Sequence, residues 1–185
     1  MHTRIEKDAF FQAGIHFEGC FYVNTYEITL SMLVETESIR EQMIALERLN
    51  CFLTSTLQNC LLIHHTEIFS IENYKKAGIR ICELPEEPLD QIIGMVLLQK
   101  FNAIMENRII ITDITLGSLL SEGVRHHIVA EIAESTMSGD FWWNKPCSGM
   151  CPDTVSHVKN DNVVRLFDDS EWAELGLAWK EKVSK

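Results

Sequence analysis

The sequence predicts an α+β protein with a ferredoxin-like split βαβ core, in which an antiparallel sheet carries two main helices, followed by a C-terminal extension rich in Trp and Cys. Three observations support this prediction. Residues 38–58 and 88–106 carry apolar side chains at the three-to-four-residue spacing of amphipathic helices. Short segments rich in β-forming residues lie before, between and after them. All four tryptophans follow residue 140.

The first expected strands form a hairpin. Residues 25–34 alternate apolar and polar side chains, which is the period-two pattern of a half-buried strand. Residues 15–23 alternate in the same way, and Asn24 lies between the two runs. We therefore expect a leading hairpin that turns near Asn24, with the first of its strands extending the core sheet.

The first helix is expected over residues 38–58, because Ser38 and Glu41 have the spacing of a capping box in front of a long apolar stripe. Two strands should follow, over 60–69 and 79–84, with a short helical segment between them. This part of the chain therefore supplies the first helix and the two inner strands of the predicted core.

The second helix is expected over residues 88–106, since Pro88 suits a first helical turn and neighbouring acidic side chains favour its positive end. It leads into residues 108–115, whose continuous Ile run predicts a strand that is central or covered on both faces. Right-handed crossovers through both helices make the ferredoxin-like topology the most economical arrangement. A doubly wound parallel sheet is the weaker alternative.

The domain organisation follows from these elements. Residues 1–24 form the leading segment, residues 25–116 form the βαββαβ core, and residues 117–185 form the extension, within one compact domain. In the extension, residues 124–135 fit either a strand or a helix. The chain ends in an expected amphipathic helix with three apolar side chains on one face, namely Trp172, Leu175 and Trp179.

Three strings in this core resemble those of small uncharacterised proteins from large tailed bacteriophages. They are LERLNCFL (46–53), LPEEPLDQIIG (84–94) and IITDIT (110–115), and the resemblance covers about residues 25–115. It implies a phage origin and an accessory role in the infected cell. The resemblance carries over no activity and no functional residues.

Charge and composition narrow the function classes. The chain has 16 Lys and Arg against 27 Asp and Glu, so its net charge of -11 repels phosphate backbones and anionic membranes. This disfavours direct binding of nucleic acid or of a membrane. The acidic balance suits solubility, a basic protein partner or mimicry of nucleic acid. With neither a secretory leader nor a long apolar run, the chain is expected to be soluble and cytoplasmic, in a bacterial host if it is viral.

A zinc site is the clearest chemical candidate. Cys147, Cys151 and His157, together with His126 or His127, would supply the four ligands that tetrahedral zinc requires. The spacing C-x3-C-x5-H departs from that of common structural zinc sites. The competing interpretation is therefore a loop with two incidental thiols.

Two acidic residues are candidates for catalysis. Asp113 lies inside an apolar strand, where a carboxylate must be hydrogen-bonded, paired or exposed, so it is either a base or metal ligand or a solvent-facing side chain. Glu131 follows His127 by four residues and could serve a zinc hydrolase as general base or ligand. Serine-nucleophile, phosphate-loop and dinucleotide motifs are absent from the sequence.

The tryptophans have two competing interpretations. Trp142, Trp143, Trp172 and Trp179 could form a partner or ligand surface, because Trp is a frequent interface anchor. Alternatively, they pin the extension onto the sheet face that the two helices leave open.

These observations favour a small, acidic, non-enzymatic accessory protein that binds a host or viral protein or a small ligand through its extension. The alternative is a zinc-dependent enzyme or zinc-stabilised domain that uses residues 126–157. A weaker alternative is hydrolysis or sequestration of a nucleotide signal, which requires Lys75, Lys76, Arg80 or Arg125 to gather in one pocket. A homodimer formed through a sheet edge or by exchange of the extension is compatible with the sequence.

Overall fold

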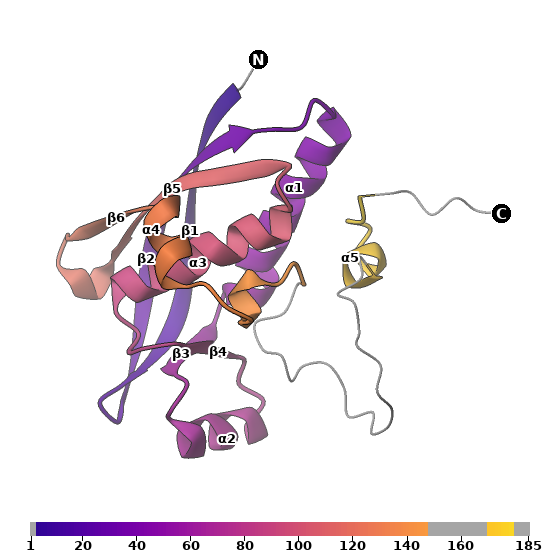
Figure 1. The fold of residues 1–185 in the computed structure, drawn as a ribbon. Helices are drawn as coiled ribbons and strands as arrows, with labels where there is room; N and C mark the ends of the chain where they lie inside the picture. The colour runs from indigo at the N-terminus through magenta and orange to yellow at the C-terminus, as the bar shows by residue number, and fades with distance from the viewer. Residues whose placement is uncertain (1–2, 148–169, 180–185) are drawn as a thin grey trace.

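The computed structural model describes residues 3–147 and 170–179, and within them the chain forms a six-stranded mixed sheet with helices packed against it (Figure 1). The strands are β1 (Thr3–Phe17), β2 (Cys20–Val34), β3 (Cys60–His64), β4 (Ile81–Leu84), β5 (Ile109–Ser118) and β6 (Arg125–Val129). They lie in the order β4-β3-β1-β2-β5-β6. The predicted α+β class is therefore confirmed.

The α-helices are α1 (Ile39–Cys51), α2 (Ile68–Lys76), α3 (Asp90–Met105), α4 (Ala130–Thr136) and α5 (Ser170–Glu174). A π-helix, Phe52–Leu57, continues α1, so both long helices lie where the sequence predicts them. Ser38 caps α1 by accepting a hydrogen bond from the backbone nitrogen of Glu41 at 3.3 Å. No helix among these described residues is long and apolar enough to cross a membrane.

The leading hairpin is much longer than predicted. β1 and β2 pair antiparallel from Thr3 opposite Val34 to Phe17 opposite Cys20. The chain reverses at Glu18 and Gly19, whose φ angles of 49° and 73° are those of the tight turns that match strand twist. The predicted turn near Asn24 is wrong.

Asn24 is instead buried in the middle of β2. Its side-chain oxygen accepts hydrogen bonds from the backbone nitrogens of Thr25, at 2.9 Å, and Leu120, at 3.3 Å. A buried amide with satisfied hydrogen bonds is compatible with a strand, although Asn is a turn former in most sequences.

The sheet departs from the ferredoxin-like arrangement in two ways. β1 lies between β2 and β3 at the centre of the sheet, where the prediction has it as an extension. β1 also pairs parallel with β3, and β3 pairs parallel with β4, so the predicted antiparallel sheet is wrong for these pairs. Apolar alternation indicates which residues form strands and which face they bury, but it does not determine which strands pair.

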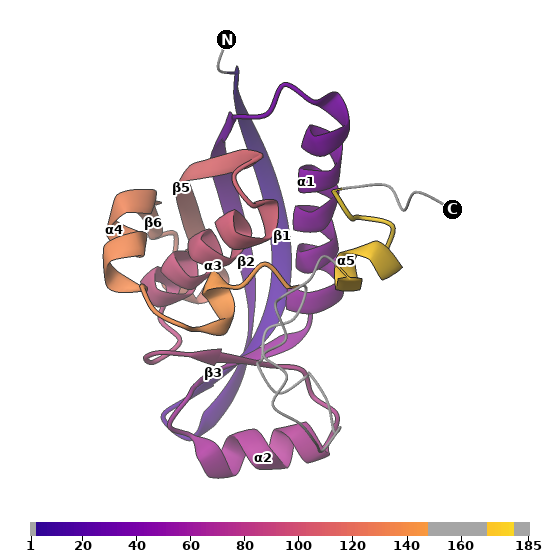
Figure 2. The same ribbon diagram turned by 45° about the vertical axis from the view of Figure 1, so that its right-hand side comes forward.

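The helices divide the two sheet faces unequally (Figure 2). α1 and α3 cover one face, and their apolar side chains join those of Phe11, Tyr26 and Leu62 in the main core. On the other face, α2 covers β3 and β4 through a small cluster that contains Ile63 and Ile71, and its Tyr74 also contacts His16 near the end of β1. We call the rest of that second face, over β1, β2, β5 and β6, the open face, because no described helix lies on it.

The C-terminal extension packs on the helical layer, and a buried arginine of α1 fixes part of it. The Arg48 guanidinium lies between the indoles of Trp172 and Trp179, 4.8 and 3.8 Å from the ring centres. Its Nε donates to the carbonyl oxygen of Leu177 at 2.8 Å, and its Nη1 pairs with Glu106 at 2.9 Å. In both views α5 lies beside α1 (Figures 1 and 2).

A buried lysine of α3 fixes the preceding part of the extension. Lys100 Nζ donates to the carbonyl oxygens of Trp142, Lys145 and Cys147 at 3.3, 2.9 and 2.7 Å. Burial lowers the pKa of Lys100 to about 8, an effect that the neighbouring Cys147 opposes. All four indoles are buried, so the structure favours the interpretation that they hold the extension. The predicted place, the open sheet face, is wrong, because these contacts are with α1 and α3.

Candidate functional site

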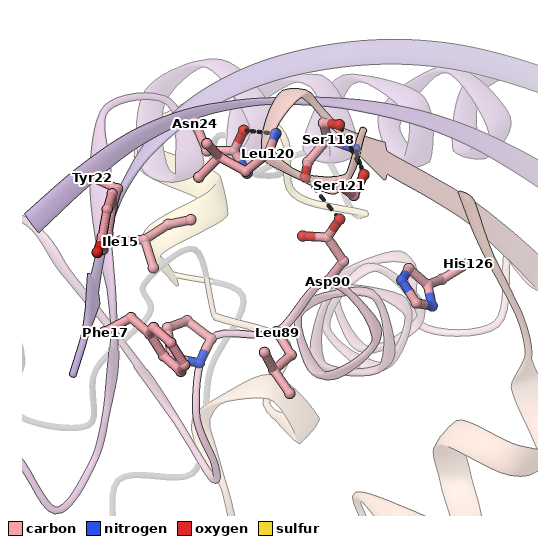
Figure 3. Close-up of a pocket in the computed structure, with 11 residues that line it drawn as sticks. Ile15, Phe17, Tyr22, Asn24, Leu89, Asp90, Ser118, Leu120, Ser121 and His126 are labelled. Atoms are coloured by element: carbon pink, nitrogen blue, oxygen red, sulfur yellow. Dashed lines mark hydrogen bonds between the residues drawn. The ribbon is translucent and has the colours of Figure 1, made fainter. Parts of the chain in front are cut away.

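A cavity of about 420 Å³ opens where the end of the β1–β2 hairpin faces the start of α3 and the connection between β5 and β6 (Figure 3). Its apolar wall consists of Ile15, Phe17, Pro88, Leu89 and Leu120. Its polar lining consists of Tyr22, Asn24, Asp90, Ser118, Ser121 and His126. Leu89 and Leu120 are 48% and 55% exposed, so the mouth presents apolar surface to solvent.

Local sequence explains why these groups meet. Pro88 disfavours helix for the residue before it, and α3 begins at Asp90. At the end of β5, Ser118 and Ser121 form a reciprocal capping box around a single turn of 3-10 helix. Glu122 and Gly123, at positive φ, then return the chain into β6. The start of α3 and this turn therefore form one rim of the cavity.

Asp90 is the charged group of the cavity. Its Oδ2 accepts a hydrogen bond from the hydroxyl of Ser118 at 2.8 Å. Figure 3 shows the other carboxylate oxygen pointing into the cavity, and no described residue donates a hydrogen bond to it. The positive end of the α3 dipole stabilises negative charge at this position. Asp90 can therefore accept a hydrogen bond from a ligand while Ser118 keeps it oriented.

Tyr26 follows Asn24 by two residues in β2, so its side chain lies on the same face of the sheet. Its side chain is fully buried and stacks on Phe11 at 4.7 Å between ring centres, and its hydroxyl has no hydrogen-bond partner among the described residues. Burial raises the pKa of Tyr26. The phenol therefore stays protonated, as a neutral donor near the cavity lining.

The two adjacent histidines of β6 lie on opposite faces of the sheet. His126 lines the cavity. His127 lies on the open face, where its Nδ1 is 3.1 Å from the Thr115 hydroxyl and 3.9 Å from Asp113 Oδ1. Because neighbouring strand residues point in opposite directions, His126 and His127 cannot serve one site.

The zinc hypothesis stays a prediction. Cys151 and His157 lie outside the described residues, and within the described ranges no three His, Cys, Asp or Glu side chains are grouped to hold a metal ion. Cys147 lies beside Lys100, with 3.8 Å between Sγ and Nζ.

The two acidic candidates for catalysis lie apart from the cavity. Asp113 is on the open face and accepts hydrogen bonds from Ser31, at 2.8 Å, and Thr112, at 3.0 Å. Glu131 is exposed in the first turn of α4. The Asp113 carboxylate is therefore satisfied by hydrogen bonds, and the Glu131 carboxylate is solvated.

The four cations named for a nucleotide pocket do not all lie together, because Arg125 is at the opposite edge of the sheet from Lys75 and Arg80. Lys75 on α2 pairs with Glu83 of β4 at 2.9 Å, and Arg80 lies at the start of that edge of the sheet. Arg125 pairs with Glu27 and belongs to β6, the opposite edge. The structure thus offers no support for the nucleotide hypothesis.

Sequence reasoning missed the cavity because its lining comes from four separate segments. The acidic residues at the start of α3 are apparent from the sequence, but helix-dipole complementarity explains Asp90 without any ligand. The sequence pattern also predicts a turn near Asn24, which is buried in β2. Only the long pairing of β1 with β2 brings the hairpin end to α3, and that pairing has no signature in the local pattern.

Comparison with known proteins provides a fold but no function. No family model and no curated protein matches the chain. It is similar in structure to an uncharacterized protein from Wolinella succinogenes, with a TM-score of 0.50 and 9% sequence identity, over 70% of this chain and 98% of that one. At this identity the likeness shows the fold alone.

Proposed function

We propose that the protein is a non-enzymatic binding protein, and that the cavity beside Asp90 holds a small molecule with an apolar body and a cationic, hydrogen-bond-donating group. The observation that carries this proposal is the free oxygen of the Asp90 carboxylate, which faces a largely apolar cavity. Small-molecule sites combine an apolar lining with a few oriented polar groups in this way.

Size supports the proposal. A volume of about 420 Å³ falls within the roughly 300–1,000 Å³ of ligand pockets. Leu89 and Leu120 at the mouth would lose exposed apolar surface on binding, at roughly 25 cal/mol for each Å² removed from water. The apolar wall therefore supplies most of the affinity, and Asp90 supplies orientation.

Charge selects the class of ligand. Asp90 is the only Asp, Glu, Lys or Arg among the residues that line the described cavity, and the whole chain carries a net charge of -11. This field concentrates cations near the surface and disfavours anions. An organic amine can contact the apolar wall and also pair with the carboxylate, whereas a carboxylic acid can contact only the wall.

Because the sequence resembles phage proteins, the proposal includes an accessory role in an infected cell. Binding is assigned to the cavity because the tryptophans of the extension, the other candidate surface, are buried against α1 and α3. In this proposal the extension stabilises the helical layer, and the cavity at the start of α3 binds the ligand.

The proposal is tested by titrating the protein with 2-phenylethylamine, 2-phenylethanol and phenylacetate, followed by chemical-shift changes in two-dimensional NMR spectra. We expect the amine to bind most tightly and to shift signals of Leu89, Leu120 and Ser118. Asp90→Asn should weaken amine binding about tenfold, as loss of one charged hydrogen bond does. Equal affinity for all three compounds would contradict the proposal.

A matched control separates this site from the general acidic field. Asp140 is an exposed acid remote in sequence from the cavity lining, with a side chain that is 93% exposed. Asp140→Asn removes the same charge, so it should leave amine binding unchanged. If both variants weaken binding equally, the attraction is nonspecific and the proposed site is wrong.

A further inference from the structure

The open face of the sheet carries two neighbouring apolar depressions. The first, about 230 Å³, lies over Gly117 and is bordered by Phe10, Leu119 and Val124. The second, about 270 Å³, is bordered by side chains that include Phe21, Val23 and Ile79. Both lie opposite the helical layer, away from the cavity beside Asp90, so they do not belong to the proposed ligand site.

Large apolar side chains are uncovered around these depressions. Phe10 is 65% exposed, Val23 66%, Leu119 75% and Val124 56%. Single exposed apolar residues are ordinary, but a group of them on one sheet face is typical of interaction sites.

Gly117 makes the first depression. It lies in a row of cross-strand neighbours that runs from Phe10 through Glu27 and Gly117 to Arg125. Because Gly117 has no side chain, the Arg125 side chain passes over it to pair with Glu27, and the first depression lies beside this ion pair. A Cβ at this position would lie 3.1 Å from Arg125 Cγ and 3.8 Å from Arg125 Nε, so a larger side chain would displace the Arg125 side chain and narrow the depression.

The two depressions adjoin at one pair of strand neighbours. Gln12 of β1 lies opposite Thr25 of β2, and its Nε2 donates to the Thr25 hydroxyl at 3.3 Å. Thr25 borders the first depression and Gln12 borders the second. An extended chain that crosses the strands would thus place one apolar side chain in each depression.

The charged side chains of the open face are mostly acidic. On the strands of this face the described carboxylates are Glu6, Asp8, Glu27 and Asp113, and the described guanidinium groups are Arg4 and Arg125. His127 lies 3.9 Å from Asp113 on the same face. Arg125 already pairs with Glu27. Asp8, which accepts a hydrogen bond from Thr29 at 2.7 Å, lies two residues from Phe10 along β1.

We propose that the open face docks an extended, cationic segment of another protein, with two apolar side chains in the depressions and Lys or Arg side chains beside Asp8 and Asp113. Charge complementarity selects this occupant, since opposite potentials attract across an interface. A second copy of the chain is disfavoured, because it would bring two acidic faces together. The proposal is independent of ligand binding beside Asp90.

Fluorescence anisotropy with a synthetic probe tests it. The probe is a labelled peptide of about twelve residues in which two Phe are separated by Lys and Ser, a length that suits extended-segment recognition. Matched peptides replace each Lys by Glu, or each Phe by Ser. We expect the cationic apolar peptide to bind and both matched peptides to bind at least about tenfold more weakly.

Variants locate the binding. Phe10→Ser removes one apolar border, and Gly117→Val narrows the first depression without changing charge, so each should weaken binding about tenfold. Met43→Ser, at an apolar residue of α1 that is 57% exposed, should have no effect. Circular dichroism confirms folding, and Gly117→Val keeps the test valid if Phe10→Ser does not fold.

Three results would overturn the proposal. The first is no binding of the cationic peptide to the intact chain. The second is binding that neither Phe10→Ser nor Gly117→Val weakens. The third is concentration-dependent dimerisation that Phe10→Ser abolishes, since this would identify a second copy as the occupant.

Discussion

The guanidinium of Arg48 lies 3.8 Å from the ring centre of Trp179, and neither side chain is more than 8% exposed. Arg48 belongs to α1 and Trp179 is the last described residue, so this contact connects the end of the described chain to the first helix. A desolvated cation over an indole contributes about 2 kcal/mol or more. Trp172 and Trp179 of the extension therefore belong to the main core.

Arg48→Ala should destabilise the protein by about 3 kcal/mol. The change removes two ring contacts, leaves the Leu177 carbonyl oxygen without this donor and leaves Glu106 without this partner. Urea unfolding measures the loss. Arg80→Ala, at an exposed arginine, should change stability by less than about 1 kcal/mol. Equal effects of the two variants would contradict a structural role for Arg48.

Lys100 should make stability depend on pH in the alkaline range. Its pKa is lowered to about 8 from an ordinary value of 10.5, so between these pH values the unfolded state binds more protons. The contribution of Lys100 to unfolding free energy should therefore rise with pH across that window. Relative to Lys100→Met, the wild type should gain about 2 kcal/mol between pH 7 and pH 10.

The control for this titration is Lys76→Met, since Lys76 is an exposed lysine of α2. The difference in unfolding free energy between Lys76→Met and the wild type should stay constant over the same pH range. A constant difference for Lys100→Met as well would show that the buried amine has an ordinary pKa.

Glu18→Asn should stabilise the protein by about 0.5–1 kcal/mol. Glu18 occupies the left-handed region at φ 49°, which Asn tolerates better than Glu does, and Asn-Gly is the preferred pair for such a hairpin turn. Thermal unfolding measures the gain. A loss of stability would contradict the left-handed conformation of Glu18 at this turn.

Tyr26→Phe should leave stability unchanged or raise it by up to about 1 kcal/mol. The Tyr26 hydroxyl is buried without a partner among the described residues, so its removal relieves an unsatisfied donor. The measurement is the urea midpoint of the two proteins. A loss of more than about 1 kcal/mol would show that the hydroxyl donates a strong hydrogen bond in solution.

Much of the local structure could be predicted from sequence. The apolar stripes located α1 and α3, and Ser38 capped α1 as expected. Residues 124–135 fitted both a strand and a helix because they contain one of each, β6 and then α4.

The sheet order and the candidate site could not be predicted in this way. The outer part of β1 alternates weakly, since Lys7 and Ala9 share the face that Phe11 buries. Its central place depends on pairing with β2 and β3, which is a long-range property. The cavity depends on the same pairing, because Tyr22 and Asn24 face α3 only when the hairpin turns at Gly19.

A crystal structure of the protein with 2-phenylethylamine would show directly whether the cavity beside Asp90 binds an amine. We expect the ring to lie against Leu89 and Leu120, and the amine nitrogen to lie within roughly 3 Å of the free Asp90 oxygen. An amine bound elsewhere, with the Asp90 cavity empty, would contradict this expectation.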